Sequence, residues 1–375
     1  MKENWRFVNL GAIDGLTIQN IYEAVAWSVS KGLAPNTIIF CYPSHPYVCI
    51  GVHQIAELEV DVDYCKLQNI PIIRRQVGGG AVYLDSNQQF YHVIVHINHP
   101  LAKKAVEDFY HEILQAVVNF YRSYGLPAKY KPINDVVIRN RKASGNGATR
   151  LYDSMVLIGN VILDFNPEKA ARILKIPDEK FRDKIVKSIS EWITSLRKEL
   201  GYIPPREEVI ERLKKNFEEA LGIELVEGNL LEEERVKLND LIKERSSYEW
   251  YAGLAIGREA LLERYSKGER IIKIHEGHYV LFIDYKGVKT LRLIIEICDN
   301  FIKDIVISGD FFVQPLESLD KLAESLRRLN INNIELMKSK IVEEFNRYIK
   351  ISAGLKPDDI INAIEKARRV LETYT

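Results

Sequence analysis

The spacing of apolar residues over the first 165 positions predicts strands and helices in alternation. Ile18, Ile21 and Val25 recur at helical intervals within residues 17–32, and a longer amphipathic pattern predicts a helix over 102–124. Runs of β-branched and aromatic residues, bounded by glycine and proline, predict strands in the same region. The other elements expected here are strands at 37–42, 47–51, 70–75, 81–84, 90–97, 135–139 and 156–165, and a short helix at 61–69.

The pattern changes after residue 166. Charged helical segments come first, and a run of strands followed by helices occupies the end of the chain. The helical segments are 167–174, 178–200 and 206–221; the later strands are 271–275, 279–285, 288–297 and 301–307; the last helices are 319–326, 335–348 and 358–372. Strands followed by helices are typical of a separate α+β domain. We therefore expect an α+β protein with one domain over 1–250, a hinge-like segment at 246–257 and a smaller domain over 258–375.

Composition narrows the class of protein. Apolar residues make up 46% and charged residues 28% of the 375 positions, which is typical of a globular protein of about two domains. Basic and acidic residues both total 52, so the sequence has no global positive field for nucleic acid. No apolar stretch approaches the ~18 residues that a membrane span needs, and the N-terminus has no signal-peptide pattern. The four cysteines form no C-x-x-C pair, which argues against a zinc or dithiol site. We expect a cytoplasmic protein.

Three consecutive glycines, Gly78–Gly80, stand between two expected strands in the sequence IPIIRRQVGGGAVYLD. Without Cβ atoms, such a run lets the backbone approach a ligand closely or adopt a positive φ. It is neither a P-loop nor a dinucleotide fingerprint, because no helix follows it and no lysine closes the motif. A structural bend is one explanation, but the adjacent Arg74 and Arg75 favour a phosphate or carboxylate site. Because successive strand residues point to opposite faces, at most one of the two arginines is expected in the pocket, and we favour Arg75.

Residues 121–150 concentrate positive charge in a protein that is neutral overall. The segment has seven basic side chains and a single acid, Asp135. It is either a solvated basic loop or an anion site for a nucleotide triphosphate, an acidic protein partner, or both. Lys142 follows a turn-like sequence and, if a short strand aims it inward, would neutralise a phosphate or polarise a carbonyl. Asp135 is expected either to bind Mg²⁺ or to form a salt bridge.

Together these segments resemble the lipoate–protein ligases of the biotin/lipoate ligase superfamily. The matching stretches are PSHPYVCIGVHQ at 43–54, RRQVGGGAVYLD at 74–85, IND at 133–135 and RKASGNGA at 141–148, with weaker matches in GNVILDF at 159–165, DKIVKSISEWITSL at 183–196 and ISGDFF at 307–312. The arginine pair with its glycine run, combined with the later lysine motif, is specific, whereas three glycines alone would not be. The resemblance implies a mixed-sheet catalytic domain of the biotin/lipoate ligase type with a smaller C-terminal accessory domain.

The resemblance also implies a two-step reaction with ATP, Mg²⁺ and lipoate. Lipoate and ATP would give lipoyl-adenylate, which a lysine of a lipoyl domain then attacks. Lys142 matches the family's signature lysine, which contacts the activated carboxylate and the phosphate, and Asp135 is the candidate metal ligand. The residues expected to bind the acyl-adenylate are Arg75, Val77, Gly78, Gly79, Gly80, Ala81, Val82, Tyr83, Asn134, Asp135, Ser144, Gly145 and Gly159.

The sequence departs from the family pattern at three places. YLD at 83–85 stands where an aromatic-His-Asp is frequent, and SGNG at 144–147 replaces Ser-Gly-Ser-Ala. Leu157 and Ile158 replace histidines that often precede the strand glycine. These differences leave the choice between lipoate and octanoate open.

Other functions remain open at this point. The main alternative is an octanoyl or lipoyl transferase that works without ATP, although no cysteine within 134–165 could serve as its nucleophile. A biotin ligase and a non-catalytic module that binds lipoylated proteins are two more, and the intact Lys142, Arg75 and glycine run argue against the last. The expected partner is a lipoyl carrier, either the glycine-cleavage H protein or a lipoyl domain of a 2-oxoacid dehydrogenase. We expect a monomer in which residues 258–375 act as a mobile lid.

Overall fold

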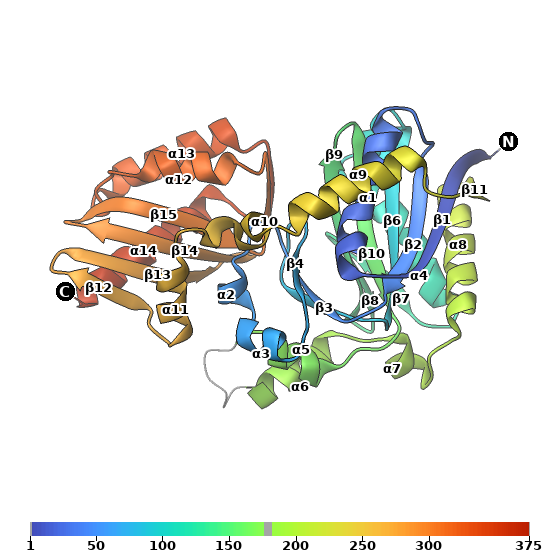
Figure 1. The fold of residues 1–375 in the computed structure, drawn as a ribbon, viewed down its shortest axis with the longest axis horizontal. Helices are drawn as coiled ribbons and strands as arrows, with labels where there is room; N and C mark the ends of the chain where they lie inside the picture. Colours follow the sequence, from blue (N-terminus) through green and yellow to red (C-terminus); the bar gives the residue numbers. More distant parts are fainter. Residues whose placement is uncertain (1, 176–181, 375) are drawn as a thin grey trace. The chain divides into compact units, whose positions relative to one another are not determined.

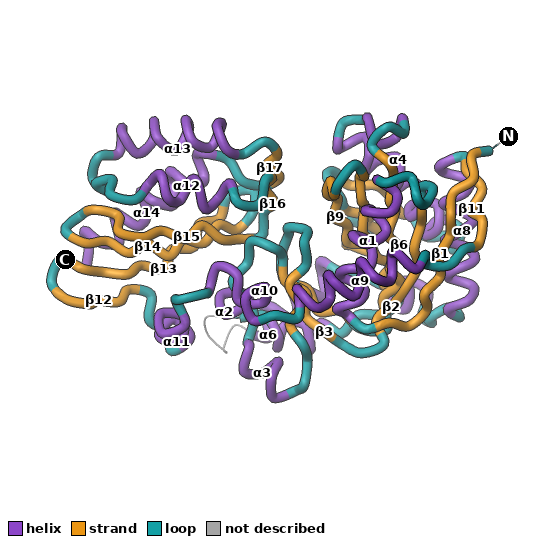
Figure 2. Tube along the Cα trace, turned by 45° about the horizontal axis from the view of Figure 1, so that its top comes forward, coloured by secondary structure: helices purple, strands orange, loops and turns teal. Residues whose placement is uncertain are grey.

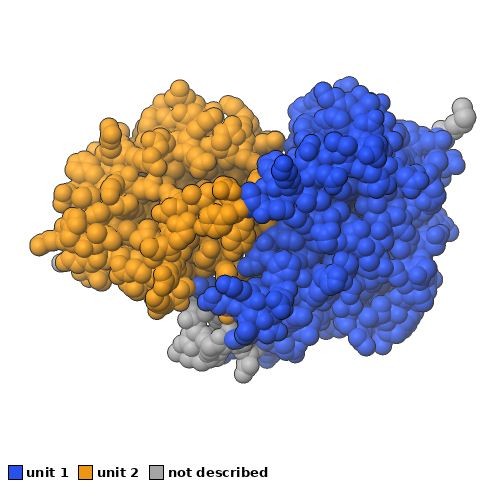
Figure 3. Space-filling model, viewed as in Figure 1, with its two compact units in different colours: residues 1–49, 63–73, 82–247 blue, residues 50–62, 74–81, 248–375 orange. Residues whose placement is uncertain are grey.

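A computed structural model describes residues 2–175 and 182–374 of the chain (Figure 1). These residues form two compact units, coloured separately in Figure 3. Unit 1 comprises residues 1–49, 63–73 and 82–247, and unit 2 comprises residues 50–62, 74–81 and 248–375. Two short segments from the first hundred residues therefore belong with the C-terminal region, whereas the sequence suggested one boundary near residue 250.

Unit 1 is built on an eight-stranded mixed sheet with the order β11-β1-β2-β6-β10-β9-β8-β7. The strands are β1 (Glu3–Ile13), β2 (Thr37–Pro43), β6 (Gln88–His96), β7 (Ala128–Lys131), β8 (Asp135–Ile138), β9 (Arg141–Leu151), β10 (Ser154–Ile162) and β11 (Ile223–Glu227). Strand β1 pairs in parallel with both β11 and β2, and the remaining neighbours are antiparallel. The α+β class with a mixed sheet is thus confirmed.

Helices α1 (Gly15–Ser30) on one side and α4 (Val106–Arg122) with α8 (Arg206–Leu221) on the other cover the two faces of this sheet. The other helical elements of unit 1 are α3 (Val62–Leu67), the 3-10 turn η1 (Pro100–Lys103), α5 (Pro167–Ile173), α6 (Arg182–Trp192), α7 (Leu196–Leu200) and α9 (Glu232–Arg245). Alternate residues of β6 point to opposite faces: Tyr91 and Val93 join the core under α4 and α8, whereas His92 meets Tyr22 of α1 on the other face. Helix α9 packs on α1. Short strands β3 (Tyr47–Ile50), β4 (Ile72–Arg74) and β5 (Val82–Leu84) complete the unit's elements.

Unit 2 contains a four-stranded antiparallel sheet with the order β12-β13-β14-β15. Its elements are α2 (Ala56–Glu59), α10 (Tyr248–Ala252), η3 (Gly253–Ala255), α11 (Glu259–Ser266), β12 (Ile271–His275), β13 (His278–Lys286), β14 (Thr290–Cys298), β15 (Phe301–Gly309), β16 (Phe312–Gln314), α12 (Ser318–Leu326), α13 (Ile334–Tyr348), β17 (Ile351–Ala353) and α14 (Pro357–Tyr374). Helices α12, α13 and α14 cover one face of the sheet, as Figure 2 also shows. On the other face, Ile55 and Leu58 pack with residues of α10 and α11.

Two expected helices differ from the observed ones. The helix expected over 102–124 begins at Val106, because residues 100–103 form a separate 3-10 turn. The His99 side chain caps this turn by accepting a hydrogen bond from the N–H of Leu101. The helix expected over 178–200, of which 178–181 lie outside the described residues, is interrupted between α6 and α7. There the N–H of Thr194 donates to the carbonyl of Lys142, 2.9 Å away, and Ser195 caps the next helix. A tertiary bond to β9 replaces the helical one.

Candidate functional site

Lys142 stands on an irregular hairpin formed by β8 and β9. The turn residues Arg139 and Asn140 both have positive φ, 49° and 65°, the conformation that suits a tight hairpin. Val137 pairs with Lys142, but Val136 pairs with Ser144, so one residue of β9 is extra and the register shifts. This β-bulge buries the intervening Ala143, whose carbonyl accepts a 2.6 Å hydrogen bond from the hydroxyl of Tyr121. Bulges of this kind redirect side chains beside functional sites.

The Lys142 ammonium lies beside two other expected site residues, Asp135 and Gly145. Its Nζ is 2.7 Å from Oδ1 of Asp135 on the neighbouring strand, so Asp135 forms a salt bridge, one of the two roles expected for it. Its stem lies over Gly145, where an added Cβ would be 3.3 Å from Lys142 Cε. The Lys142 side chain stays 40% exposed, which leaves the amine accessible to a ligand. Gly145 and Asp135 thus orient the Lys142 ammonium while its side chain remains solvent-accessible.

A hydrogen-bonded network supports this hairpin from the adjacent strands. Asn134 and Asn146 bond reciprocally through side-chain amides and main-chain carbonyls, with Asn146 Nδ2 donating to Asn134 O at 2.9 Å. The Tyr91 hydroxyl donates to Asn146 Oδ1 and lies 3.1 Å from the Ser144 hydroxyl. Burial raises the pKa of Tyr91, so its hydroxyl keeps the proton that it donates.

Gly159 is needed where this network crosses β10. A Cβ there would lie 2.0 Å from Asn146 Oδ1 and 2.4 Å from the Tyr91 ring, which excludes any larger residue without a shift. The next residue, Asn160, accepts a 3.0 Å hydrogen bond from the N–H of Gly145. The sequence predicted Gly159 but missed Tyr91, Asn146 and Asn160 as site components. Tyr91 lies within an apolar strand run and carries no local signal, whereas Asn146 was visible as a departure in the SGNG motif.

The segment between α6 and α7 is fastened to the lysine hairpin. Glu199 of α7 is 1% exposed and pairs with Arg141 at 2.7 Å and also with Arg139. Its Oε1 also accepts a 2.6 Å hydrogen bond from the Thr194 hydroxyl. Two of the seven basic residues therefore share one buried carboxylate, which reduces the free positive charge of the hairpin.

The glycine run belongs to unit 2. The Arg75 guanidinium donates to the carbonyls of Gly78 and Gly80, at 2.8 and 3.0 Å, and so closes the loop on itself. Gly79 adopts a φ of +102°, which L side chains rarely reach. Val77 is buried, while the glycines remain partly exposed. The loop is thus a tight turn with accessible backbone.

The two arginines before the glycines have different environments. Arg74 is 4% exposed, and carbonyl oxygens of its own unit engage its guanidinium. Arg75 is only half-buried and lies over the loop. This arrangement is consistent with the preference for Arg75 as the ligand-facing arginine.

The expected site residues therefore fall into two groups, each described on its own unit. Unit 2 carries Arg75, Val77, Gly78, Gly79, Gly80 and Ala81, and unit 1 carries Val82, Tyr83, Asn134, Asp135, Lys142, Ser144, Gly145 and Gly159. In unit 1, the hairpin residues and Gly159 come together through the network above. Tyr83 is buried beneath Lys169, whose Nζ lies 5.2 Å from the ring centre, and burial raises its pKa. Val82 is 43% exposed.

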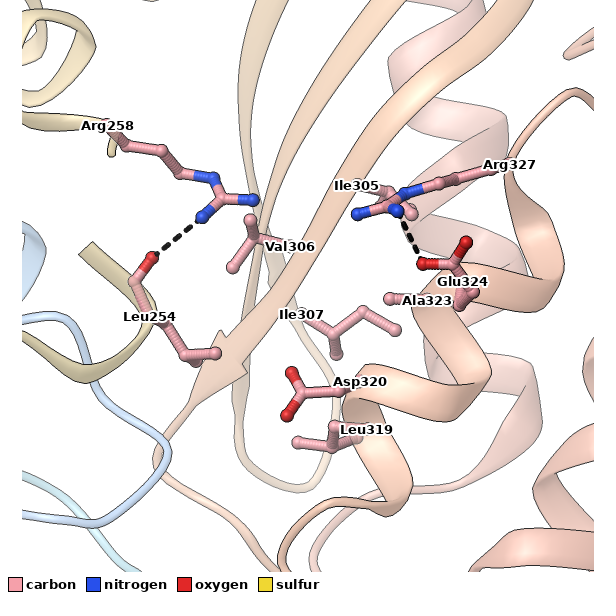
Figure 4. A pocket seen from close by; sticks show the side chains of 10 residues that line it. All are labelled: Leu254, Arg258, Ile305, Val306, Ile307, Leu319, Asp320, Ala323, Glu324 and Arg327. Carbon is pink, nitrogen blue, oxygen red and sulfur yellow. Dashed lines mark hydrogen bonds and ion pairs between the residues drawn. The ribbon is translucent and has the colours of Figure 1, made fainter. Parts of the chain in front are cut away.

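A surface hollow of about 240 Å³ in unit 2 is unrelated to these residues (Figure 4). It lies against β15 and α12, with Ile305 and Ile307 among its apolar residues. Its two arginines are paired: Arg258 and Arg327 both bind Asp304, at 2.6 and 2.9 Å. The hollow therefore offers little free charge to a ligand.

Among the described residues, no group of three or more His, Cys, Asp or Glu side chains could hold a metal ion. No helix in the same part of the chain is both long and apolar enough to cross a membrane.

Comparisons with known proteins agree on one family. The family model described as the lipoyl protein ligase A/B catalytic domain matches residues 17–218. Octanoyltransferase LipM of Kyrpidia tusciae is 28% identical over 270 residues, which cover 66% of this chain and 98% of that protein.

Two solved structures are similar in fold. A bi-partite lipoate protein ligase of Thermoplasma acidophilum, described together with its E2 lipoyl domain, is 29% identical with a TM-score of 0.61, over 67% of this chain and 97% of that one. P. falciparum LipL1, in complex with lipoate, has a TM-score of 0.63 over 97% of this chain and 99% of that one. Its identity is 14%, so this second likeness concerns the fold alone.

Proposed function

Because this chain belongs to the lipoyl protein ligase A/B family, we propose that it uses ATP to join a lipoate-type acid to a lysine of a lipoyl carrier protein. The observation that carries the proposal is the Lys142 ammonium, held over bare Gly145 and beside Asp135 while remaining accessible. A fixed cation of this kind stabilises negative charge that develops on a carboxylate, a phosphate or a carbonyl oxygen.

The chemistry needs two steps because a carboxylate is a poor electrophile. In the first, a carboxylate oxygen attacks the α-phosphorus of ATP, and pyrophosphate leaves. In the second, the carrier's lysine amine attacks the carbonyl carbon of the acyl-adenylate, the C–O bond to AMP breaks, and the amine loses a proton. Lys142 would neutralise charge on the shared carboxylate and phosphate oxygens in both steps, and the protein otherwise supplies positioning.

The glycine loop supplies the second group of contacts in this proposal. Its partly exposed backbone and the half-buried Arg75 are suited to an anionic ligand. We assign a role in binding the acyl-adenylate to this loop. Gly79 and Gly80 would present main-chain atoms to the ligand without a Cβ to block it. The bare face of Gly78 instead packs against Phe312.

Magnesium fits this site as a partner of the nucleotide rather than as a resident ion. Mg²⁺ is often held by one or two carboxylates together with substrate phosphates, so the lack of a larger acidic cluster among the described residues is compatible with it. Asp135 is the carboxylate that would hold the ion, and the ion would neutralise phosphate charge.

The proposed use of ATP is supported by the part of this chain that has no counterpart in an octanoyltransferase relative. The octanoyltransferase of K. tusciae is covered over 98% of its length yet matches only 66% of this chain, so a third of this chain has no counterpart in it. The T. acidophilum ligase is described as bi-partite, and it too matches about two thirds of this chain. We infer that the remaining third serves the step that a ligase has and a transferase lacks.

The proposed acceptor is a lipoyl domain of a carrier protein. The T. acidophilum ligase is described together with its E2 lipoyl domain, which makes such a domain the first carrier to test. The glycine-cleavage H protein is the second. Lipoate and octanoate both remain candidate acids.

A second function is favoured by the name of the K. tusciae relative, which is an octanoyltransferase. In that case the octanoyl group would come from another carrier as a thioester, the acceptor lysine would displace the thiol, and ATP would have no part. The family membership and the Lys142 site serve either reaction.

The deciding experiment incubates the full chain with a lipoyl domain under two conditions. One contains lipoate or octanoate with ATP and Mg²⁺, and the other contains an octanoyl-loaded carrier protein without ATP. Mass spectrometry of the lipoyl domain and pyrophosphate release are followed in parallel. The proposal predicts acid-dependent pyrophosphate release and acylation in the first condition alone. Acylation only from the loaded carrier would instead establish the transferase.

A further inference from the structure

Arg74, rather than facing a ligand, is enclosed by main-chain carbonyls from two distant segments. Its N–H groups already donate to these carbonyls and are therefore not available to bind an anion. Its Nη1 lies 3.2, 2.9 and 2.6 Å from the carbonyls of Gly51, Val52 and Gln54. Its Nε and Nη2 reach the carbonyls of Trp250, Tyr251 and Ala252, with the shortest distances 2.9 Å to Trp250 and 2.8 Å to Tyr251.

The main chain of Arg74 is held as well. Its carbonyl accepts a 3.0 Å hydrogen bond from the indole N–H of Trp250. Gly253 lies against the guanidinium, because a Cβ there would be 3.2 Å from Arg74 Cζ. Burial lowers the pKa of Arg74 to about 10, so the guanidinium still carries its charge at neutral pH. A charged group with all its donors engaged is costly to displace.

The glycine loop rests directly on the first of those segments. A Cβ on Gly51 would be 2.2 Å from the carbonyl oxygen of Gly79, so the two glycine backbones touch. The N–H of Arg75 donates to the Ile50 carbonyl at 3.0 Å, and the N–H of Val52 donates to the Val77 carbonyl at 3.3 Å. The position of residues 50–54 therefore fixes the conformation of the loop.

The turn at Gly309–Phe312 forms a second support. A Cβ on Gly78 would lie 2.5 Å from Phe312 Cβ and 2.6 Å from the Phe311 carbonyl. The N–H of Gly309 donates to the His53 carbonyl at 3.0 Å, and the His53 ring stacks on Phe311 at 5.7 Å. Two parts of the C-terminal region thus contact the loop or its immediate support.

We propose that Arg74 is a positioning residue that sets the conformation of the glycine loop by tying it to residues 250–252, with the Gly309–Phe312 turn as a second support. The C-terminal region would then act on the reaction by shaping the loop that binds the small ligand. The consequence for catalysis rests on the proposed function, whereas the effect on the loop does not. Neither support requires contact with the substrate.

The test compares Arg74→Lys with Arg245→Lys in the full chain. A lysine ammonium has three N–H groups and cannot reach six carbonyls. Arg245 is the matched control, because it is also buried and bonded, at 2.6 Å to both Asn20 and Glu23, but belongs to unit 1. Hydrogen exchange of the amides of residues 77–81 is measured without ligand. Arg74→Lys should speed that exchange roughly tenfold or more, as the loss of one or two charge-assisted hydrogen bonds implies, while the amides of 141–147 stay unchanged.

A second pair of variants covers the case in which Arg74→Lys fails to fold. Gly253→Ala places a methyl group against the guanidinium, whereas Gly257 also has a positive φ but a methyl group there would meet nothing within 4 Å. Faster exchange of residues 77–81 in Gly253→Ala, but not in Gly257→Ala, is the expected result. Unchanged loop exchange in Gly253→Ala, or a uniform increase across the chain equal to that of Arg245→Lys, would overturn the proposal.

Ligand binding and turnover give the catalytic readout. Calorimetry with lipoate should show weaker binding to Arg74→Lys, and KM for the acid should rise more than kcat falls, because the loop is disordered but Lys142 is untouched. Normal lipoate affinity alongside a loosened loop would overturn the catalytic part of the proposal. If the wild-type chain neither binds lipoate nor releases pyrophosphate, the proposed function fails, and the exchange data still decide the role of Arg74.

Discussion

The position of the Lys142 side chain is set by three neighbouring residues, Ala143, Gly145 and Asp135. The bulge at Ala143 puts an extra residue in β9, and Gly145 leaves room for the lysine stem. The ion pair with Asp135 then restrains the ammonium, although both side chains remain partly exposed, so the pair contributes little to stability. The ion pair matters for geometry, because it restrains the orientation of the accessible Lys142 ammonium.

Replacing Lys142 with alanine should abolish most activity without unfolding the protein. Loss of one preorganised charge contact at a reacting centre typically lowers the rate by ~10²–10³. Carrier acylation is measured by mass spectrometry, and circular dichroism reports the fold. Lys131→Ala is the control, because it removes a basic residue of the same segment that was not assigned to the site. Equal activity of the two variants would contradict the role of Lys142.

His92 is expected to make the protein sensitive to acid. The ring is fully buried against Tyr22 and Phe90, and no described residue bonds either ring nitrogen. Burial lowers its pKa to about 3. Because the unfolded chain takes up a proton near pH 6.5 and the native one does not, the free energy of unfolding should fall as pH drops from about 6.5 toward 3.

The variant His92→Leu tests this at neutral and acidic pH. Removing two unsatisfied buried nitrogens should raise the free energy of unfolding by ~1 kcal/mol at pH 7. The variant should also lose part of the decline between pH 6.5 and 4. Urea unfolding at pH 7 and pH 5 supplies both values, and the exposed His45→Leu is the control. A variant as acid-sensitive as the wild type would rule out His92 as the cause.

At the scale of elements, the hairpin of β8 and β9 depends on a segment that the sequence predicted as continuous helix. The break between α6 and α7 lets Thr194 bond the main chain of Lys142 and brings Glu199 to two arginines of the turn. A helix running through this point would satisfy its own amides and leave β9 without these partners. The interruption thus couples two elements that are about fifty positions apart in sequence.

Glu199→Gln should loosen this coupling. The amide keeps the shape but removes the charge that Arg139 and Arg141 share, so the free energy of unfolding should fall by ~1–2 kcal/mol. Hydrogen exchange at residues 139–145 should accelerate, and carrier acylation should fall several-fold because Lys142 is less well held. Glu227→Gln is the control and should change none of these, because the Glu227 side chain, which pairs with Lys214, is 68% exposed. Unchanged exchange at 139–145 would show that the hairpin holds itself.

At the scale of the whole molecule, neither of the two units is a single continuous segment of the chain. The chain passes between them after residues 49, 62, 73, 81 and 247. The segments 50–62 and 74–81 carry apolar and charged groups whose partners lie in residues 248–375. The C-terminal region therefore completes a structure that begins near residue 50.

Truncation after residue 247 should consequently affect more than a lid. Ile55 and Leu58, 0% and 3% exposed, would lose their apolar partners, and Arg74 would lose the carbonyls of residues 250–252. We expect loss of lipoate binding and of both half-reactions, including transfer from chemically made lipoyl-adenylate. A lid alone would leave that transfer intact, so its survival in the truncated chain would contradict this expectation and favour residues 258–375 as a lid.

Much of the secondary structure follows from local sequence. The four strands of the C-terminal sheet lie within two residues of their expected bounds, because alternating apolar residues and glycine or asparagine turns are local signals. By contrast, β1 was not expected, although it joins β11 to β2 in the large sheet. Its parallel pairing with β2 and β11 joins residues far apart in sequence, which no local pattern encodes.

The candidate site divides in the same way. The sequence by itself determined the residue types, namely three glycines without Cβ, an arginine pair and a lysine in a basic hairpin, because the chemistry of those side chains does not depend on the fold. Only the tertiary structure decided that Arg74 is enclosed while Arg75 covers the loop, that Asp135 pairs with Lys142 across a bulge, and that the glycine loop packs with the C-terminal unit. These outcomes depend on carbonyls, bare glycine surfaces and buried partners supplied by distant segments, such as Phe312 against Gly78, and long-range packing of that kind leaves no periodicity in the sequence.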